Sequence, residues 1–130
     1  MKREGIICYF IKDNKILLLQ VDYGNENGQK LYWSGVSGYI ENGESPEDAL
    51  MREVKEELGV SIKKYDIQFK GVVDISQNLK LHIFFIGDLE EKPVPRESSI
   101  KQLQWFAINQ IPYTEMHPGT DSWLPDLLKQ

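Results

Sequence analysis

The chain has 130 residues, of which 41% are hydrophobic, and its formal net charge is −5 at pH 7. This length predicts a single domain over residues 1–130, and the acidic charge argues against a nucleic-acid polymer as partner, because binding its backbone normally needs a basic stripe. No stretch approaches the roughly 18 apolar residues of a membrane span, and no signal peptide is recognisable, so we expect no membrane partner and a soluble, cytoplasmic protein.

The first third of the chain predicts strands and a loop. Residues 5–11 and 15–21 are rich in β-branched and apolar side chains, and the polar run 12–14 separates them, which predicts a β-hairpin. The only cysteine, Cys8, lies in the first of these strands, where we expect it to fill the core; one cysteine also excludes an internal disulfide. The polar, glycine-rich run 22–30 predicts a surface loop.

Helix signals follow a further predicted strand at residues 31–33. Ser45 is suited to cap a helix, Pro46 to occupy its first position, and Asp48 to complete a capping box. Gly59 stands where a left-handed residue commonly ends a helix. The expected apolar side of this helix consists of Leu50, Val54 and Leu58.

The opposite side of the predicted helix carries Glu53, Glu56 and Glu57. Carboxylates three and four residues apart repel each other by about a few tenths of a kcal/mol per pair. Arg52 lies four residues before Glu56 and is suited to orient one of them. The pattern fits either an ordinary solvated helix face or a site for a hard divalent cation such as Mg²⁺, which prefers carboxylate and phosphate oxygens.

The remainder of the chain predicts more strands and a closing helix. In order, we expect a strand at 66–75, a turn at 76–78, a strand at 79–89, a loop at 90–99, a strand at 103–107, a turn at 108–112 and a helix at 121–130 capped by Asp121. Strands on both sides of one long helix, with a second helix at the end, predict an α+β layered fold.

The run from Gly38 to Val60 resembles the signature of the Nudix hydrolase family, G-x5-E-x7-R-E-U-x-E-E-x-G-U, where U is aliphatic. Its specified positions are filled in order, without insertion, by Gly38, Glu44, Arg52, Glu53, Val54, Glu56, Glu57, Gly59 and Val60. Beyond the signature, residues 31–128 resemble the MutT-type branch of the family. This branch includes the mammalian hydrolase of oxidised purine nucleoside triphosphates. The resemblance implies a mixed β-sheet sandwiched between α-helices.

The resemblance also implies a site for Mg²⁺ or Mn²⁺. Glu56 and Glu57 would be direct ligands, together with the carbonyl of Gly38, and Glu53 would be a further ligand or the base that activates water. Arg52 would orient Glu53 or Glu56.

Two further carboxylates are expected to assist this site. The resemblance implies that Glu44 braces the loop behind the metal ligands. Many relatives carry another glutamate about six residues before the tryptophan of the last strand. Ser99 occupies that place here, and Glu97 is the nearest carboxylate, so Glu97 is the candidate accessory residue.

Substrate contacts are expected at Ser34, His117 and Asp121. In the mammalian enzyme a base-reading asparagine stands at the place of Ser34, and a stacking tryptophan stands at the place of His117. Its two adjacent base-reading aspartates correspond to Gly119 and Thr120, one step before Asp121. Because a lost bidentate contact to a base typically costs about 1 to 3 kcal/mol of discrimination, these differences argue against selectivity for oxidised purines.

The expected function is Mg²⁺-dependent hydrolysis of a nucleoside diphosphate linked to another group. A (d)NTP or modified (d)NTP, cleaved to NMP and pyrophosphate, is the expected substrate. The alternatives are a Nudix hydrolase acting on a nucleotide sugar or a dinucleotide, and a non-catalytic module that binds nucleotide. The intact set of acidic residues argues against the last, because a pure binder does not need carboxylates that repel one another.

Overall fold

The computed structural model describes residues 2–24, 26–87 and 89–130. Seven strands form one sheet: β1 (Arg3–Lys12), β2 (Lys15–Asp22), β3 (Leu31–Ser34), β4 (Val36–Tyr39), β5 (Ile67–Ser76), β6 (Leu79–Ile86) and β7 (Ile100–Ala107). The α-helices are α1 (Pro46–Leu58) and the short α2 (Leu124–Leu128). Single 3-10 turns lie at Lys64–Asp66, Ile108–Gln110, Tyr113–Glu115 and Thr120–Ser122.

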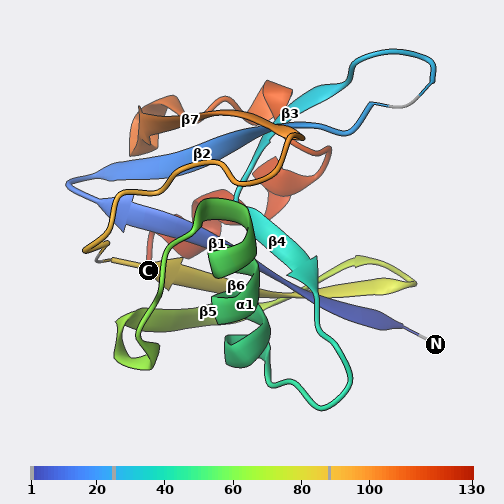
Figure 1. Ribbon diagram of the computed structural model, residues 1–130. Coiled ribbons are helices and arrows are strands. Elements are labelled where there is room, and N and C mark those ends of the chain that lie inside the picture. The colour runs from blue at the N-terminus through green and yellow to red at the C-terminus, as the bar shows by residue number, and fades with distance from the viewer. Residues whose placement is uncertain (1, 25, 88) are drawn as a thin grey trace.

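The sheet is mixed, as the family resemblance implies (Figure 1). Its strand order is β3-β2-β1-β6-β5, with β4 paired to β1 and β7 paired to β2. Only the β1–β6 pair is parallel among the described strands, and the others are antiparallel. The predicted hairpin is confirmed: Asp13 and Asn14 turn between β1 and β2 with φ of 53° and 62°, as a two-residue hairpin loop requires.

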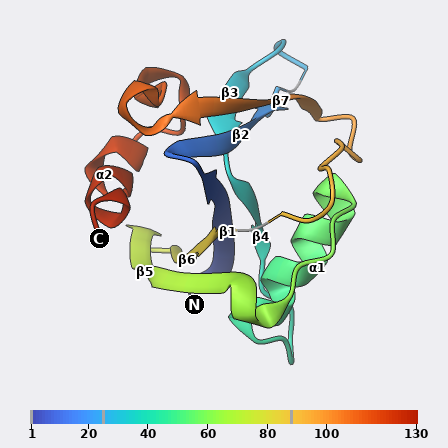
Figure 2. The same cartoon turned by 90° about the vertical axis from the view of Figure 1, so that its left-hand side faces the viewer.

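The two faces of the sheet bury different cores, because successive strand residues point to opposite sides. On β1, Ile6, Cys8 and Phe10 face the core beneath α1, whereas Ile7 and Tyr9 face the core beneath the C-terminal segment. Figure 2 shows α1 and α2 on opposite sides of the strands. The predicted sandwich is therefore confirmed, and Cys8 fills the core as expected.

The ends of α1 follow the sequence signals. The Asp48 backbone N–H donates to Ser45 Oγ at 3.1 Å, which satisfies one of the free donors at the helix start. At the other end Gly59 adopts φ 70° and its N–H donates to the Lys55 carbonyl. The predicted apolar stripe, Leu50, Val54 and Leu58, is buried in the core.

Leu58→Ala tests the contribution of this stripe to stability. Leu58 is 1% exposed, so truncation leaves a cavity, and we expect the free energy of unfolding to fall by about 2 to 5 kcal/mol. The matched control is Leu31→Ala on β3, where the side chain is 37% exposed. Urea denaturation should show a clearly smaller loss for the control, and equal losses would contradict the packing described for α1.

The C-terminal helix differs from the prediction. Asp121 does not cap it, because Asp121 lies inside the 3-10 turn Thr120–Ser122 that precedes α2. The helix begins at Leu124, its N-cap is Trp123, and no side chain caps it. A proline in the first turn, Pro125, suits this later start because its missing N–H is not needed there.

Other predicted elements are close to the observed ones. Strand β6 ends at Ile86, before the predicted end at residue 89, and β4 was not predicted as a strand. Three residues that belong to predicted elements lie outside the described residues. They are Met1 of the predicted domain, Asn25 of the predicted loop 22–30 and Asp88 of the predicted strand 79–89. In the described parts of the chain, none of the helices has the length and apolar character needed to cross a membrane.

Candidate functional site

Arg52 is the centre of a cluster of charged side chains on α1. Its Nε and Nη2 donate to the two carboxylate oxygens of Glu44 at 2.8 and 3.0 Å. Its Nη1 donates to Glu53 Oε1 at 2.7 Å and lies 3.5 Å from Glu56 Oε2. This forked geometry fixes the carboxylates more tightly than a point charge would. Arg52 therefore contacts both Glu53 and Glu56, the two alternatives that the family resemblance implied for it.

Glu44 attaches the loop between β4 and α1 to this arginine. Its Oε1 also accepts the backbone N–H of Glu41 at 2.9 Å, and Arg52 Nη2 donates to the carbonyl of Tyr39 at 3.0 Å. The hydrogen bonds from Arg52, followed by the one from Glu41, lower the pKa of Glu44 to about 2. Glu44 is thus a permanent anion that holds the loop against the helix.

Glu57 is the buried member of the cluster. Only 8% of it is exposed, and its Oε2 has no hydrogen-bond partner among the described residues. Burial, and then the neighbouring carboxylates of Glu53, Glu97 and Glu56, raise the pKa of Glu57 to about 9. A buried carboxylate oxygen without a donor is costly, so this position calls for a cation or a proton.

The loop after β6 brings Glu97 to the same place. The backbone N–H groups of Val94 and Arg96 donate to the carbonyls of Leu58 and Glu57 at 3.1 and 2.8 Å. These bonds satisfy carbonyls at the end of α1 that have no partner within the helix. Because the loop is held there, Glu97 lies close enough for its charge to raise the pKa of Glu57.

Gly38 lies on β4, directly against the cluster. A β-carbon at this position would overlap the carboxyl group of Glu53. We therefore expect Gly38→Ala to displace Glu53 and to lower kcat/KM at least about tenfold, because small displacements of catalytic groups have large effects. Gly87→Ala is the control, since a β-carbon there meets nothing within 4 Å. Equal kinetics for the two variants would contradict the close approach of β4 to Glu53.

The donor set fits a hard divalent cation. Glu53, Glu56 and Glu57 offer carboxylate oxygens, and the unpartnered Oε2 of Glu57 is the observation that favours an ion. Among residues 2–24, 26–87 and 89–130, no three acidic, histidine or cysteine side chains are already arranged around one point. Arg52 contacts both Glu53 and Glu56, so its guanidinium fixes where these two carboxylates lie.

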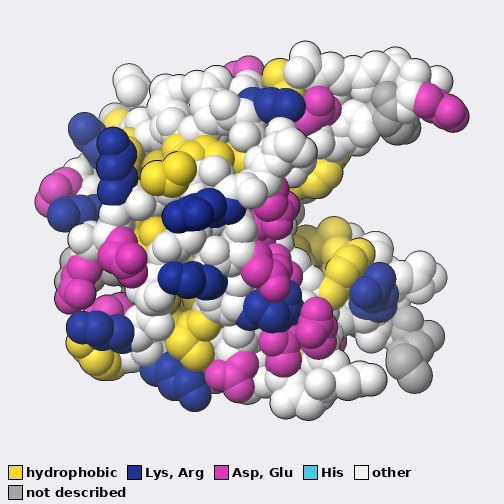
Figure 3. Space-filling model, in the orientation of Figure 1, with side chains coloured by type: hydrophobic (Ala, Val, Ile, Leu, Met, Phe, Trp, Pro, Cys, Tyr) yellow, Lys and Arg dark blue, Asp and Glu magenta, His cyan; other side chains and the backbone are white. Residues whose placement is uncertain are grey.

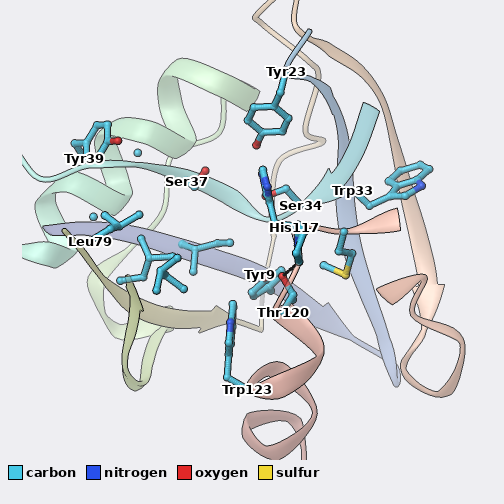
Figure 4. A pocket seen from close by; sticks show the side chains of 17 residues that line it. Tyr9, Tyr23, Trp33, Ser34, Ser37, Tyr39, Leu79, His117, Thr120 and Trp123 are labelled. Carbon is cyan, nitrogen blue, oxygen red and sulfur yellow. Dashed lines mark hydrogen bonds between the residues drawn. The ribbon is translucent and has the colours of Figure 1, made fainter. Parts of the chain in front are cut away.

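A pocket of about 460 Å³ lies beside the cluster (Figure 4). Gly38 joins the two sites, because it lines this pocket and also contacts Glu53. Tyr39 and Leu79 lie at one end of the pocket, and Tyr23 and His117 lie away from them. The lining side chains are mostly apolar or aromatic, with a few hydroxyls, which is typical of a small-molecule site.

Two of the three predicted substrate residues line this pocket. Ser34 is buried there, and the ring of His117 is stacked on Tyr32 with the centroids 4.7 Å apart. Partial burial, and then the charge of Lys30, lower the pKa of His117, so the ring is suited to stacking as a neutral imidazole. The third residue, Asp121, is not among the residues that line this pocket, whereas the preceding Thr120 is; its contact with substrate stays a prediction.

Several lining residues were missed by the sequence analysis. Gly5, Ile7 and Tyr9 alternate along β1 and line the pocket together. Their spacing of two was visible in the sequence as a strand pattern, but it gave no indication that this face borders a pocket. Ser37 and Trp123 lie on distant elements and gave no local signal.

Figure 3 shows a hollow in the surface between the end of the molecule that carries the β2–β3 loop and the end that carries the β5–β6 turn. Acidic side chains gather along the wall of the hollow, and hydrophobic ones lie within it. A negatively charged wall would repel an anionic substrate unless cations were bound to it. The shape and charge therefore agree with a site where metal and substrate bind together.

Comparison with known proteins gives a consistent result. Residues 1–127 match the family described as NUDIX domain. The mouse protein named oxidized purine nucleoside triphosphate hydrolase is 33% identical over 75% of this chain and 64% of its own length. An uncharacterized Nudix hydrolase of Bacillus subtilis is 31% identical over 94% of this chain and 77% of its own length.

Another relative is the NAD-capped RNA hydrolase NudC of Pseudomonas fluorescens, 33% identical over 73% of this chain and 34% of its own length. The chain thus spans less than two thirds of the mouse protein and about one third of this one.

Solved structures share the fold. A MutT NUDIX hydrolase from Burkholderia pseudomallei superposes with a TM-score of 0.78 at 21% identity, covering 100% of this chain and 98% of that one. A MutT protein from Bacillus halodurans gives 0.71 at 23% identity, with coverages of 95% and 80%.

Proposed function

Because this chain belongs to the NUDIX domain family, we propose that it is a divalent-metal-dependent pyrophosphohydrolase. Its substrate is a nucleoside diphosphate linked to another group, and a (d)NTP or modified (d)NTP cleaved to NMP and pyrophosphate is the first candidate. The observation that carries this proposal is Glu57, a buried carboxylate with an unpartnered oxygen among further carboxylates. The names of the mouse and Bacillus relatives support the same class of reaction.

Glu53, Glu56 and Glu57, with the Gly38 carbonyl, would hold Mg²⁺ or Mn²⁺. Bound there, the metal supplies charge neutralisation of the phosphate oxygens and a water whose pKa is lowered toward neutrality. Arg52 keeps the ligands in place by its fork of hydrogen bonds, and Glu44 anchors that arginine.

Removal of a proton from water falls to Glu53 or Glu97. The guanidinium of Arg52 donates to Glu53 Oε1 at 2.7 Å, so this oxygen is already engaged by a fixed donor. Glu97 has no ion pair among the described residues and lies next to Glu57. We therefore assign Glu53 mainly to ion binding and Glu97 to proton transfer.

The pocket would hold the nucleoside part of the substrate. Its aromatic side chains suit stacking on a flat ring, and the neutral His117 is suited to the same role. No charged side chain lines it among the described residues, which favours a neutral ring and argues against strong selection of one base. Oxidised and unmodified dNTPs should then be hydrolysed at similar rates.

A substrate panel tests the proposed function. The protein is incubated with Mg²⁺ and dNTPs, oxidised dNTPs, nucleotide sugars or dinucleotides such as NAD, and the phosphate-containing products are separated by chromatography. The NAD-capped RNA hydrolase among the relatives justifies including dinucleotides. We expect metal-dependent turnover of at least one member by the wild type and none by Glu57→Gln. Absence of turnover on every member, or equal turnover by the variant, would refute the enzymatic assignment.

A further inference from the structure

The row of residues that lines the pocket from β1 continues outward to a charged side chain. Gly5, Ile7 and Tyr9 line the pocket, and Arg3 is the next residue of the same alternating row. Since side chains two residues apart share one face of a strand, Arg3 lies on the pocket side of the sheet. Lys2 and Glu4 belong to the alternate row.

Arg3 is held at the mouth of the pocket. Its backbone is in register with Leu79 of β6, and its guanidinium carbon lies 3.5 Å from the centroid of the Tyr39 ring. Both Leu79 and Tyr39 line the pocket, and Figure 4 shows them together at one end. Tyr39 also joins the acidic cluster, because its carbonyl accepts a hydrogen bond from Arg52.

The charge of Arg3 is available to a ligand. It is exposed and forms no ion pair with the acidic side chains in the described parts of the chain. The guanidinium lies over the Tyr39 ring and makes no hydrogen bond to the other described side chains, so its N–H groups suit bidentate binding of a phosphate. Arg52 cannot serve in this way, because Glu44 and Glu53 occupy its donors.

We propose that Arg3, oriented by Tyr39, binds the phosphate chain of the substrate at the mouth of the pocket. This rests on the proposed function, in which the nucleoside lies in the pocket and the phosphates lie near the carboxylate cluster. Arg3 is a substrate-binding residue: it holds the phosphates in the ground state and in the transition state alike. Its loss therefore raises KM and leaves kcat nearly unchanged.

Kinetics of Arg3→Ala, Arg3→Lys and Lys2→Ala test this role. Lys2 carries the same charge one residue away and pairs with Asp74, so Lys2→Ala controls for general loss of positive charge. On the best substrate of the panel we expect Arg3→Ala to raise KM about tenfold, with kcat within about twofold, and Arg3→Lys to restore part of the affinity. A KM for Arg3→Ala equal to that of Lys2→Ala would overturn the proposal.

A binding measurement separates this proposal from the proposed function. Calorimetry in the presence of Mg²⁺ measures the affinity for two ligands. The first is the α,β-methylene analogue of dATP, which cannot be cleaved between the α- and β-phosphates. The second is deoxyadenosine, which has no phosphate. We expect Arg3→Ala to weaken only the analogue, by about tenfold. Equal weakening of both ligands would show that Arg3 merely shapes the pocket and would refute its role. If the wild type binds the analogue through Arg3 but hydrolyses nothing, the phosphate site stands and the proposed hydrolase activity fails.

Discussion

Glu57→Gln should abolish turnover while leaving the fold intact. We expect kcat/KM to fall by about 1,000-fold or more, because the variant removes a carboxylate oxygen from the metal site, and metal stabilisation of a phosphoryl transition state is worth several kcal/mol. The free energy of unfolding of the metal-free protein should not fall. Glu57 is buried with its pKa raised to about 9, so at pH 7 glutamine replaces a neutral acid of nearly equal shape.

The pH dependence of stability checks this interpretation. In the unfolded chain Glu57 loses its proton near the ordinary pKa of 4.5, whereas in the folded metal-free protein it keeps the proton to about pH 9. The unfolded state is therefore favoured as the pH rises between these values. Denaturation in EDTA should show a wild-type stability that declines across this range more steeply than that of Glu57→Gln. Parallel curves for the two proteins would contradict the buried acid.

Arg52→Lys is expected to have the second-largest effect. Lysine keeps the charge but cannot donate at once to both oxygens of Glu44 and to Glu53, as Arg52 does at 2.7 to 3.0 Å. We expect kcat/KM to fall about 100-fold, as when groups that orient metal ligands are lost. The free energy of unfolding should fall by about 1 to 3 kcal/mol, because the partly buried carboxylates lose their donors.

A double-mutant cycle with Glu44→Gln identifies the cause. If Arg52 acts through its bidentate bond to Glu44, the double variant should lose less stability than the sum of the two single variants. Additive losses, or a wild-type kcat/KM for Arg52→Lys, would contradict the role of this arginine as the centre of the cluster.

The features that could be predicted from the sequence are local ones. The caps at Ser45 and Gly59 and the turn at Asp13 and Asn14 depend on residues a few positions apart, and all were confirmed. The contact of Arg52 with Glu56 follows from their spacing on one helix.

The features that could not be predicted arise from tertiary contacts. Glu57 belongs to the acidic side of the helix in sequence, but the loop that carries Val94 and Arg96 folds over the helix end beside it, and the residue is buried. The pocket collects residues from strands and from the C-terminal segment that are far apart along the chain. Asp121 does not cap the C-terminal helix because it lies inside the 3-10 turn Thr120–Ser122, which gave no distinct sequence signal.

Mn²⁺ binding tests most directly whether Glu53, Glu56 and Glu57 form a metal site. The free ion is measured by electron paramagnetic resonance in solutions of the wild type and of Glu57→Gln. The carboxylates of Glu53, Glu56 and Glu57 should remove free Mn²⁺ from solution, Mg²⁺ should release it, and Glu57→Gln should bind at least about tenfold more weakly. Glu41→Gln, an exposed acid of the neighbouring loop, should bind like the wild type. Equal binding by the wild type and Glu57→Gln, or no binding by either, would contradict a divalent-metal site that includes Glu57.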